Sequence, residues 1–330
     1  MDIVHWGIVG AGNVCERKSG PAFYKAAHSR LVAVARRDGA KAKDFAERHG
    51  AARWYADAGE LVADPRVDAV YVATPPSSHA ELTIMALRAG KAVYVEKPMA
   101  MTYGEAEEMN RVAEACGQPL FVAHYRRALP YFLKVKELLE ERAVGEVLSV
   151  QVTLLRPPSA ADLSGDPGNW RVAPAIGGEG YFHDLAPHTL DILDMLLGEV
   201  EMARGETRNL GGLYQAMDTF AAVLRFRSGV LGSARWCFVV SGVSAEDSIV
   251  ITGSKGEIRF STFAFTPIEW VVATGVKRFD IPPPEHIQQP LIQSIVNELR
   301  GKGRAPSTGK SAARTARVMD EILGTPGIYH

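Results

Sequence analysis

Residues 3–15 read IVHWGIVGAGNVC, an apolar run of strand length that leads directly into two closely spaced glycines. Gly10 permits a tight turn, and Gly12, which has no Cβ atom, lets the backbone approach a pyrophosphate at a helix N-terminus. Cys15 stands where a third glycine or an alanine is usual in this pattern. The stretch predicts a strand, a turn and a helix that bind a dinucleotide; a plain strand-to-helix turn is the alternative. The residues of this turn expected to bind the cofactor are Gly10, Gly12, Asn13 and Val14.

Beyond this turn, apolar runs of strand length alternate with segments whose apolar residues return every three or four positions. That alternation is typical of a parallel sheet wound with helices. The Gly20-Pro21 pair is expected to interrupt or delay the first helix, and Gly50, Gly90 and Gly117 are expected to end later ones. Strands are predicted at residues 3–9, 31–35, 69–73, 92–96 and 120–123, and helices at 40–49, 78–89 and 103–116.

After about residue 122 the pattern changes to that of an α+β domain. A helix is expected over residues 130–142, followed by strand-like runs at 149–155, 220–226, 230–238 and 248–252 and by helices at 287–299 and 310–323. Turn signals between the runs are typical of a meandering antiparallel sheet. We therefore predict an α/β domain with a doubly wound parallel sheet over residues 1–123. An α+β domain built on an open mixed or antiparallel sheet is predicted over residues 124–330.

The composition narrows the class of protein. The 330 residues include 37 Lys and Arg against 38 Asp and Glu, so the net charge is −1 and no field attracts nucleic acid or an anionic membrane. No apolar run reaches about 18 residues, and the first residues carry neither a basic nor a long apolar region, so we expect a cytoplasmic protein. Cys15, Cys116 and Cys237 are too far apart to predict a disulfide framework or a zinc site.

The strand predicted at 31–35 runs into Arg36-Arg37-Asp38. At this place an Asp or Glu accepts hydrogen bonds from the ribose 2′-OH of NAD, whereas an Arg accommodates the 2′-phosphate of NADP. A guanidinium can pair with that phosphate through two hydrogen bonds and stack on the adenine ring. We therefore expect Arg36 and Arg37 to favour NADP. The alternative is NAD, with Asp38 as the ribose ligand and both arginines solvated.

Polar residues follow the strand predicted at 69–73, at the edge where ligands of an open α/β sheet bind. Thr74 and Pro75 are expected to line the cofactor, and His79 is expected to reach toward it unless it has a structural role. Ser77 or Ser78 is better explained as the N-cap of the next helix, with Glu81, three positions after Ser78, completing a capping box.

Glu96-Lys97-Pro98 ends the strand predicted at 92–96 with a charged pair, which is unusual after an apolar run. Pro98 restricts Lys97 to an extended conformation and so limits where its ammonium points. A cation at that edge can polarise a carbonyl or stabilise a forming alkoxide. The alternative is an ordinary surface ion pair at the end of a strand.

A second polar cluster comprises Asn169-Trp170-Arg171 and residues 177–191, which read GGEGYFHDLAPHTLD. If a helix starts at Asp184, His188 and Asp191 follow on the same helix face. Histidine suits proton transfer to or from a hydroxyl, and a neighbouring carboxylate orients it. The alternatives are a metal site with His183 as a further ligand and a structural helix cap at Asp184.

Taken in order, these motifs resemble the glucose-fructose oxidoreductase / inositol dehydrogenase (Gfo/Idh/MocA) family. The matching elements are Gly-Ala-Gly at 10–12, Glu-Lys-Pro at 96–98, Trp-Arg at 170–171 and the Gly-Gly…Asp-x-x-x-His-x-x-Asp run that ends at residue 191. The resemblance implies an N-terminal Rossmann domain, a C-terminal open mixed sheet, and hydride transfer between a nicotinamide and a sugar, polyol or related compound. Glu179, which interrupts the usual glycine triplet, and Ala186, which replaces a common glycine, depart from the family pattern.

The family roles map onto particular residues here. The resemblance implies that Lys97, Asp184 and His188 are the catalytic trio and that Trp170 and Arg171 lie near the nicotinamide or substrate. Tyr125 and Arg126 match positions that line the substrate pocket. The implied cofactor contacts are Gly10, Gly12, Asn13, Val14, Arg36, Arg37, Thr74, Pro75, His79, Glu96, Lys97, Trp170 and Arg171; the implied substrate contacts are Lys97, Tyr125, Arg126, Asp184 and His188.

The resemblance further implies a homodimer or homotetramer formed through the open sheet face, with no metal in the site. NADP is the expected cofactor and NAD the alternative. Two rival functions remain open: a sensor or regulator that binds a nicotinamide nucleotide without catalysis, and a zinc-dependent enzyme. The sensor would have no need of a proton-transfer trio, and the zinc enzyme would require stoichiometric metal.

Overall fold

The computed structural model describes residues 1–324, which form two compact units. The first unit combines Met1–Leu129 with Pro284–Ala313, and the second combines Pro130–Pro283 with the residues from Arg314 onward. The linear division predicted at residue 123 differs from this, because it assigned the returning segment Pro284–Ala313 to the second domain. That segment packs by contacts between parts of the chain that are distant in sequence, which local patterns do not reveal.

The first unit is built on a parallel six-stranded sheet, as predicted. Its strand order is β3-β2-β1-β4-β5-β6, so the order reverses between β1 and β4. In such doubly wound sheets the ligand binds outside the carboxyl ends of the strands at this reversal. The edge strand β3 was not predicted, because its sequence Arg-Trp-Tyr is largely exposed and forms no apolar run. The strands are β1 (Val4–Val9), β2 (Ser29–Ala35), β3 (Arg53–Tyr55), β4 (Ala69–Val72), β5 (Ala92–Val95) and β6 (Leu120–Val122).

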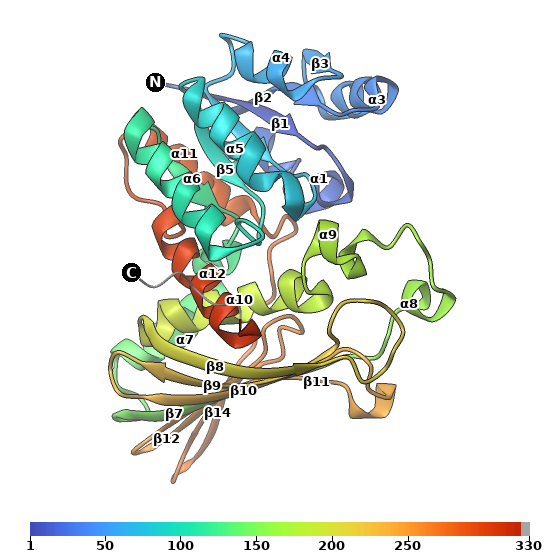
Figure 1. Ribbon diagram of the computed structural model, residues 1–330. Coiled ribbons are helices and arrows are strands. Elements are labelled where there is room, and N and C mark those ends of the chain that lie inside the picture. The colour runs from blue at the N-terminus through green and yellow to red at the C-terminus, as the bar shows by residue number, and fades with distance from the viewer. Residues whose placement is uncertain (325–330) are drawn as a thin grey trace. The chain divides into compact units, whose positions relative to one another are not determined.

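Helices connect these strands, and α5 and α6 lie side by side (Figure 1). Gly50, Gly90 and Gly117 follow helices with φ of 71°, 77° and 62°, which confirms the predicted left-handed ends. The Gly20-Pro21 pair separates two short helices, as expected. The helices are α1 (Asn13–Arg17), α2 (Ala22–Lys25), α3 (Gly39–His49), α4 (Ala58–Ala63), η1 (Pro76–Ser78), α5 (His79–Arg88), α6 (Tyr103–Cys116), η2 (Tyr125–Ala128) and α11 (Gln289–Leu299).

A cluster of buried aromatic rings forms part of the core of the first unit. The Phe23 ring centroid on α2 lies 4.9 Å from that of Trp6 and 5.0 Å from that of Tyr71. Tyr71 and Tyr94, on the adjacent strands β4 and β5, are stacked with centroids 5.0 Å apart. Large rings bury much apolar area and prefer such offset or tilted contacts, so this cluster fastens α2 to the middle of the sheet.

A buried hydrogen-bond network ties the returning segment to the same sheet. The Glu96 carboxylate, which follows β5 and is 6% exposed, accepts hydrogen bonds from Tyr71 Oη at 2.5 Å and Gln288 Nε2 at 2.6 Å. Gln288 Oε1 in turn accepts one from Tyr94 Oη at 2.7 Å. Burial raises the pKa of both tyrosines well above the ordinary value, so both keep the protons that they donate. The hydrogen bonds from these donors replace those that the carboxylate would make to water if it were exposed.

The second unit is built on a mixed eight-stranded sheet of order β14-β13-β12-β11-β7-β10-β9-β8. The central pair β7 and β10 is parallel and the other pairs are antiparallel, which confirms the predicted open mixed sheet. The strands are β7 (Val147–Leu155), β8 (Val200–Arg208), β9 (Thr219–Phe226), β10 (Leu231–Cys237), β11 (Glu246–Gly253), β12 (Gly256–Phe260), β13 (Ile268–Val272) and β14 (Gly275–Phe279).

Helices α7 and α10 contact each other and lie on one face of this sheet (Figure 1). Buried and exposed residues alternate along β9, which is the pattern of a strand with one covered face. No helix within residues 1–324 is long and apolar enough to cross a membrane. The helices of this unit are α7 (Pro130–Glu140), α8 (Ala160–Ser164), η3 (Trp170–Val172), α9 (Pro174–Gly177), α10 (Gly180–Leu197) and η4 (Gly242–Ser244); α12 (Gly309–Leu323) begins in the first unit and ends in the second.

The Glu96 network makes a prediction about stability. Replacing Gln288 by Met keeps the side-chain length but removes both hydrogen bonds, so Glu96 and Tyr94 each lose a buried partner. We expect the free energy of unfolding to fall by about 1–3 kcal/mol, measured by chemical denaturation. Gln289→Met is the matched control, because Gln289 makes no side-chain hydrogen bond within residues 1–324. Equal losses in the two variants would contradict the role given to Gln288.

Candidate functional site

The glycine turn after β1 contains two glycines with different surroundings. Gly10 has φ of +86°, and a Cβ built on it would lie 2.5 Å from Thr74 Cγ2 and 2.8 Å from Thr74 N. The end of β4 therefore requires glycine at this position. A Cβ built on Gly12 would meet only Gly10 O, at 3.8 Å, among the described residues. The missing side chain of Gly12 thus leaves open space at the strand ends, and the binding of a pyrophosphate there stays a prediction.

Helix α1 begins immediately after this turn and buries Cys15, the residue at the third-glycine position. Burial raises the pKa of the Cys15 thiol to about 12, so it stays protonated and acts as a small apolar side chain. The acidic residue Glu16 accepts hydrogen bonds from Arg48 Nη1 and Nη2 at 2.8 and 2.9 Å. These bonds lower the pKa of Glu16 to about 2, so an ion pair holds α1 to α3.

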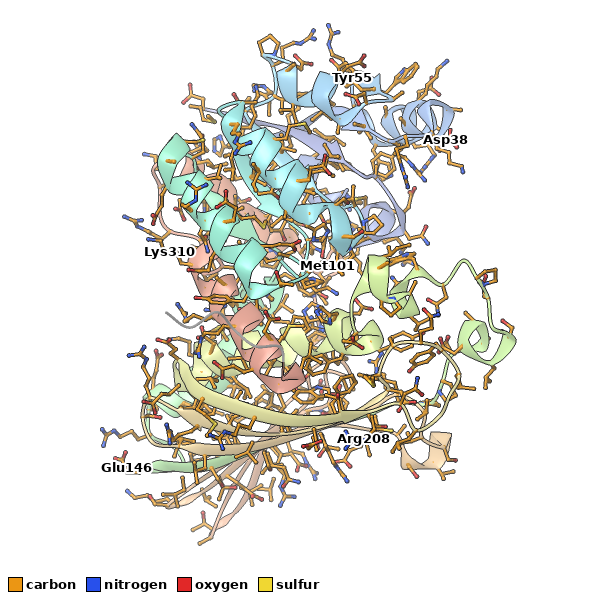
Figure 2. The ribbon with its side chains drawn as sticks, in the orientation of Figure 1. Asp38, Tyr55, Met101, Glu146, Arg208 and Lys310 are labelled. Carbon is orange, nitrogen blue, oxygen red and sulfur yellow. The ribbon has the colours of Figure 1, made fainter. Side chains whose placement is uncertain are left out.

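The charged residues after β2 have separate roles in the structure. Arg36 is half-buried and Arg37 is exposed. Asp38 is the N-cap of α3: its Oδ1 accepts a hydrogen bond from Lys41 N at 3.1 Å, which lowers the pKa of Asp38, and its Oδ2 pairs with Lys41 Nζ at 3.1 Å. Figure 2 labels Asp38 next to α3 and Tyr55 at the end of β3, in the same unit. The Asp38 carboxylate is therefore engaged by its own helix.

The residues after β4 bond mainly to one another. Ser78 Oγ donates to Pro75 O at 2.9 Å, lies 2.8 Å from Thr74 Oγ1, and makes no side-chain bond to the start of α5. The predicted capping box with Glu81 is therefore wrong, because the serine hydroxyl finds closer partners in the preceding loop. Thr74 and Pro75 themselves stand at the carboxyl end of β4, as predicted.

His79 links the ends of two strands. Its Nε2 lies 2.8 Å from Thr74 O, after β4, and its Nδ1 lies 2.8 Å from Pro98 O, after β5. Burial lowers the pKa of His79, which favours the neutral ring. A neutral ring has one N–H, so it donates to one of these two carbonyls. The predicted contact of His79 with the cofactor stays a prediction.

Lys97 stands at the carboxyl end of β5, directly after the buried carboxylate. Its backbone N–H donates to Glu96 Oε2 at 3.1 Å, and the peptide bond to Pro98 is cis. The network of Glu96 therefore holds the backbone of Lys97 as well as the returning segment. The carboxylate oxygens of Glu96 accept hydrogen bonds from the protein, so its predicted contact with the cofactor stays a prediction.

Tyr125 and Arg126 follow β6 in the short helix η2. Both are buried, at 6% and 3% exposure, and the Arg126 Cζ atom lies 5.0 Å from the centroid of the Tyr125 ring. A guanidinium over an aromatic face is held by the ring quadrupole. This contact orders the two residues relative to each other at the same sheet edge as Lys97.

In the second unit, α10 carries the predicted acid–base residues. The helix begins at Gly180 rather than at Asp184, so Asp184 is not its cap. Asp184, His188 and Asp191 are spaced by four and three residues on this helix, which places them on one face, as predicted. Asp184 Oδ2 accepts a hydrogen bond from Arg171 Nε at 3.2 Å. The carboxylate is therefore ion-paired at the first turns of the helix.

The Trp170-Arg171 turn packs against the start of α10. Arg171 Cζ lies 4.6 Å from the centroid of the Trp170 ring, so the guanidinium contacts both the ring and Asp184. A Cβ built on Gly177 would lie 2.5 Å from Arg171 O and 2.8 Å from Trp170 O. The glycine run is needed here because the backbone of the turn lies directly on it. The Trp170-Arg171 motif and the motif that contains Asp184, both predicted to contribute to the site, are therefore in contact.

The interrupting Glu179 has structural partners on two sides. Its backbone N–H donates to His183 Nδ1 at 2.9 Å, and its carboxylate Oε2 accepts a hydrogen bond from Met217 N at 3.1 Å. The first contact occupies one of the two ring nitrogens of His183, Nδ1. Across the described part of the chain, no three His, Cys, Asp or Glu side chains are grouped to hold a metal ion.

The surroundings of His188 include residues that the sequence did not reveal. The Phe263 ring lies 5.6 Å from the imidazole of His188, at an interplanar angle of 80°. Arg156, at the end of β7, places its Cζ 4.8 Å from the centroid of the Phe263 ring. Neither residue belongs to a recognisable motif. Phe263 reaches His188, and Arg156 reaches Phe263, only through the fold, so no local signal could have found them.

The predicted residues thus form two groups, one in each unit. Which of them contact the cofactor or substrate stays a prediction. The first group stands at the carboxyl ends of β1, β2, β4, β5 and β6 and comprises Gly10, Gly12, Asn13, Val14, Arg36, Arg37, Thr74, Pro75, His79, Glu96, Lys97, Tyr125 and Arg126. The second group surrounds the start of α10 and comprises Trp170, Arg171, Asp184 and His188.

Comparison with known proteins finds relatives along nearly the whole chain. Residues 4–124 match the family described as "Oxidoreductase family, NAD-binding Rossmann fold", and residues 132–259 match the "GFO/IDH/MocA C-terminal domain". The chain is 39% identical to "Oxidoreductase P35" of Formosa agariphila over 98% of this chain and 99% of the relative. It is 30% identical to trans-1,2-dihydrobenzene-1,2-diol dehydrogenase of Sus scrofa over 84% and 80% of the two chains.

The fold is shared with solved structures. An oxidoreductase from Agrobacterium radiobacter, in complex with NAD+, L-tartaric acid and magnesium, superimposes with a TM-score of 0.85. The sequences are 24% identical, and the match covers 98% of this chain and 96% of that one. At this identity the likeness shows the fold alone. It confirms the predicted combination of a doubly wound parallel sheet with a second, mixed sheet.

The two glycines give a prediction that separates folding from nucleotide binding. Gly12→Ala adds a methyl group in open space, so we expect the melting temperature to stay within about 2 °C of that of the parent protein while the affinity for NADPH or NADH falls at least tenfold. Gly10→Ala forces a methyl group into Thr74, so we expect destabilisation of about 1–3 kcal/mol. Differential scanning fluorimetry and fluorescence titration measure both. Undiminished nucleotide affinity in Gly12→Ala would refute this position for the pyrophosphate.

Proposed function

This chain belongs to the Gfo/Idh/MocA family of oxidoreductases, and from that membership we propose an NADP(H)-dependent enzyme that acts on a hydroxyl or carbonyl carbon of a sugar, polyol or related small molecule. The family match covers both units. The relative from Sus scrofa is named for a diol substrate, which supports a CH–OH group as the point of reaction. When bound, the nicotinamide supplies or accepts the hydride.

The cap at Asp38 is the observation that carries the choice of NADP. In an NAD site a carboxylate after β2 accepts hydrogen bonds from the ribose. Here the Asp38 carboxylate already accepts a hydrogen bond from Lys41 N and pairs with Lys41 Nζ. Arg36 and Arg37 then supply the positive charge next to the strand end, which suits a 2′-phosphate.

The residues of this chain divide the remaining chemistry among them. His188 takes the proton of the substrate hydroxyl during oxidation and returns it during reduction. The Lys97 ammonium stabilises the negative charge that develops on the substrate oxygen. Asp184 is ion-paired with Arg171 and holds a substrate hydroxyl or orients His188. Tyr125, Arg126 and Trp170 contribute to the surface that receives the substrate.

We also propose that the protein assembles as a homodimer or homotetramer through the outer face of the eight-stranded sheet. Val223 on β9 and Leu231 on β10 are 54% and 55% exposed on neighbouring strands. Apolar residues on an open sheet face favour association, because burial removes their surface from water.

The cofactor assignment predicts a change of preference on substitution. Arg36→Asp combined with Arg37→Ser replaces positive charge by a ribose-binding carboxylate. We expect the affinity for NADPH to fall about 10- to 100-fold, the equivalent of about 1.4–2.8 kcal/mol, while the affinity for NADH is kept or improved. Fluorescence titration with both nucleotides measures this, after absorbance has excluded nucleotide that is already bound. An unchanged NADPH affinity would refute the role of the two arginines.

The catalytic assignment predicts that Lys97→Met loses turnover but keeps nucleotide binding. Removing the positive charge beside the substrate oxygen is expected to lower kcat about 10²- to 10³-fold, with the dissociation constant for NADPH within about threefold of the parent value. Steady-state kinetics on a panel of sugars and polyols supplies the readout. Near-normal turnover in this variant would remove Lys97 from the mechanism. Binding without turnover of any compound by the parent protein would favour a nicotinamide-binding sensor.

A further inference from the structure

The loop after β12 touches α10 at two consecutive residues. The Phe263 ring meets the imidazole of His188 edge to face, with centroids 5.6 Å apart, and Thr262 Oγ1 lies 3.2 Å from Thr189 Oγ1. All four residues belong to the second unit. An aromatic ring at this distance restricts the rotation of its neighbour and attracts it through the ring quadrupole. The position of the imidazole therefore depends on the conformation of this loop.

A single carboxylate fixes that conformation. Asp247 on β11 accepts hydrogen bonds from three consecutive backbone N–H groups. Thr262 N donates to its Oδ1 at 2.9 Å, and Phe263 N and Ala264 N donate to its Oδ2 at 2.7 and 2.8 Å. Charge-assisted hydrogen bonds are stronger than neutral ones. Asp247 thus determines the path of the backbone on both sides of Phe263.

Tyr131 on α7 fastens both ends of the same loop. Its Oη donates to Thr266 O at 2.7 Å and accepts a hydrogen bond from Ser261 N at 3.0 Å. Between them Phe265 adopts φ of +49°, a left-handed conformation that a bulky residue rarely takes. Its ring packs on Tyr131, with centroids 5.2 Å apart. Such a conformation persists only where the surroundings determine it, so the loop is held firmly.

Arg156 packs on the Phe263 ring. Its guanidinium lies over the Phe263 ring, with Cζ 4.8 Å from the centroid. Phe263 is only half-buried, and the cation over its face helps to hold the ring where burial alone would not. Strand ends and loops from β7, β11 and β12 therefore converge on the ring that contacts His188.

We propose that Asp247 is a positioning residue for His188. It fixes residues 262–264 by three hydrogen bonds, which hold the Phe263 ring against the imidazole and so set the direction in which that imidazole exchanges a proton with the substrate. The inference rests on the proposed function of His188 as the acid–base residue. It assigns Asp247 no contact with substrate or cofactor. Reactive groups must be held within a fraction of an ångström, and a helix-borne histidine alone can rotate about two side-chain bonds.

Kinetics with a matched control form the first part of the test. Asp247→Asn keeps the shape of the side chain but turns an amide group toward backbone donors, and Phe263→Leu removes the ring. We expect each variant to lower kcat roughly 10- to 100-fold, with KM and the NADPH dissociation constant within about threefold. Phe263→Tyr, which keeps the ring, should retain most of the activity. Glu246→Gln is the control, because the exposed Glu246 on the same strand pairs only with Ser248 and Arg235 within the described chain.

Epistasis distinguishes positioning from a merely structural role. If Asp247 acts through His188, its effect on kcat should disappear once the imidazole has been removed. In a His188→Ala background we therefore expect Asp247→Asn or Phe263→Leu to lower kcat by less than a further twofold. A full additional loss in that background would overturn the proposal. A His188→Ala variant with normal turnover would instead refute the proposed function of His188.

A measurement independent of activity completes the test. In protein labelled with 15N-histidine, the ring signals of His188 are assigned by their loss in His188→Gln. Both Asp247→Asn and Phe263→Leu should shift these signals, because the neighbouring ring moves or disappears, whereas Glu246→Gln should not. Unmoved His188 signals in Asp247→Asn would overturn the positioning role, even for an enzyme whose substrate has not been found. Melting temperatures show whether each variant folds. If Asp247→Asn does not fold, Asp247→Glu takes its place in the test.

Discussion

A carboxylate buried at the end of a parallel strand must find hydrogen-bond donors, and Glu96 finds them in three parts of the chain. Tyr71 belongs to the neighbouring strand, Gln288 to the returning segment, and the third donor is the backbone N–H of Lys97. The cost of burying the charge is offset only while all these parts are in place. The end of β5, where Lys97 stands, is therefore coupled to the packing of residues 284–313 into the first unit.

The second unit uses carboxylates in a similar way to fix loops around α10. Asp247 accepts hydrogen bonds from three backbone N–H groups at and beside Phe263, and Glu179 accepts one from the backbone N–H of Met217. Each loop keeps one conformation without contributing to a regular strand or helix. Groups that must be placed accurately, such as the His188 imidazole, are then held by a rigid helix on one side and by fastened loops on the other.

Three unusual features of the sequence motifs, at Cys15, Gly20-Pro21 and Glu179, have structural explanations in this chain. Cys15 fills the third-glycine position because the helix there needs only a small apolar side chain, and its pKa of about 12 keeps it unreactive. The Gly20-Pro21 turn lies so close to Cys15 that a Cβ on Gly20 would overlap the Cys15 carbonyl. Glu179 stands among glycines because its carboxylate has a backbone partner across the unit. These three features affect how the protein packs, whereas Arg36 and Arg37 are proposed to determine which cofactor binds.

Local sequence determined the glycine turn at Gly10 and Gly12, the three left-handed helix ends, and the alternation of five strands with helices in the first unit. These features depend on backbone geometry and on residue spacing, which a chain carries with it before it folds. It also determined that Asp184 and His188 share a helix face, because their spacing is helical. Only the tertiary structure decided that Gln288 reaches Glu96 and that Phe263 contacts His188. Those contacts join segments distant in sequence, and no local periodicity encodes them.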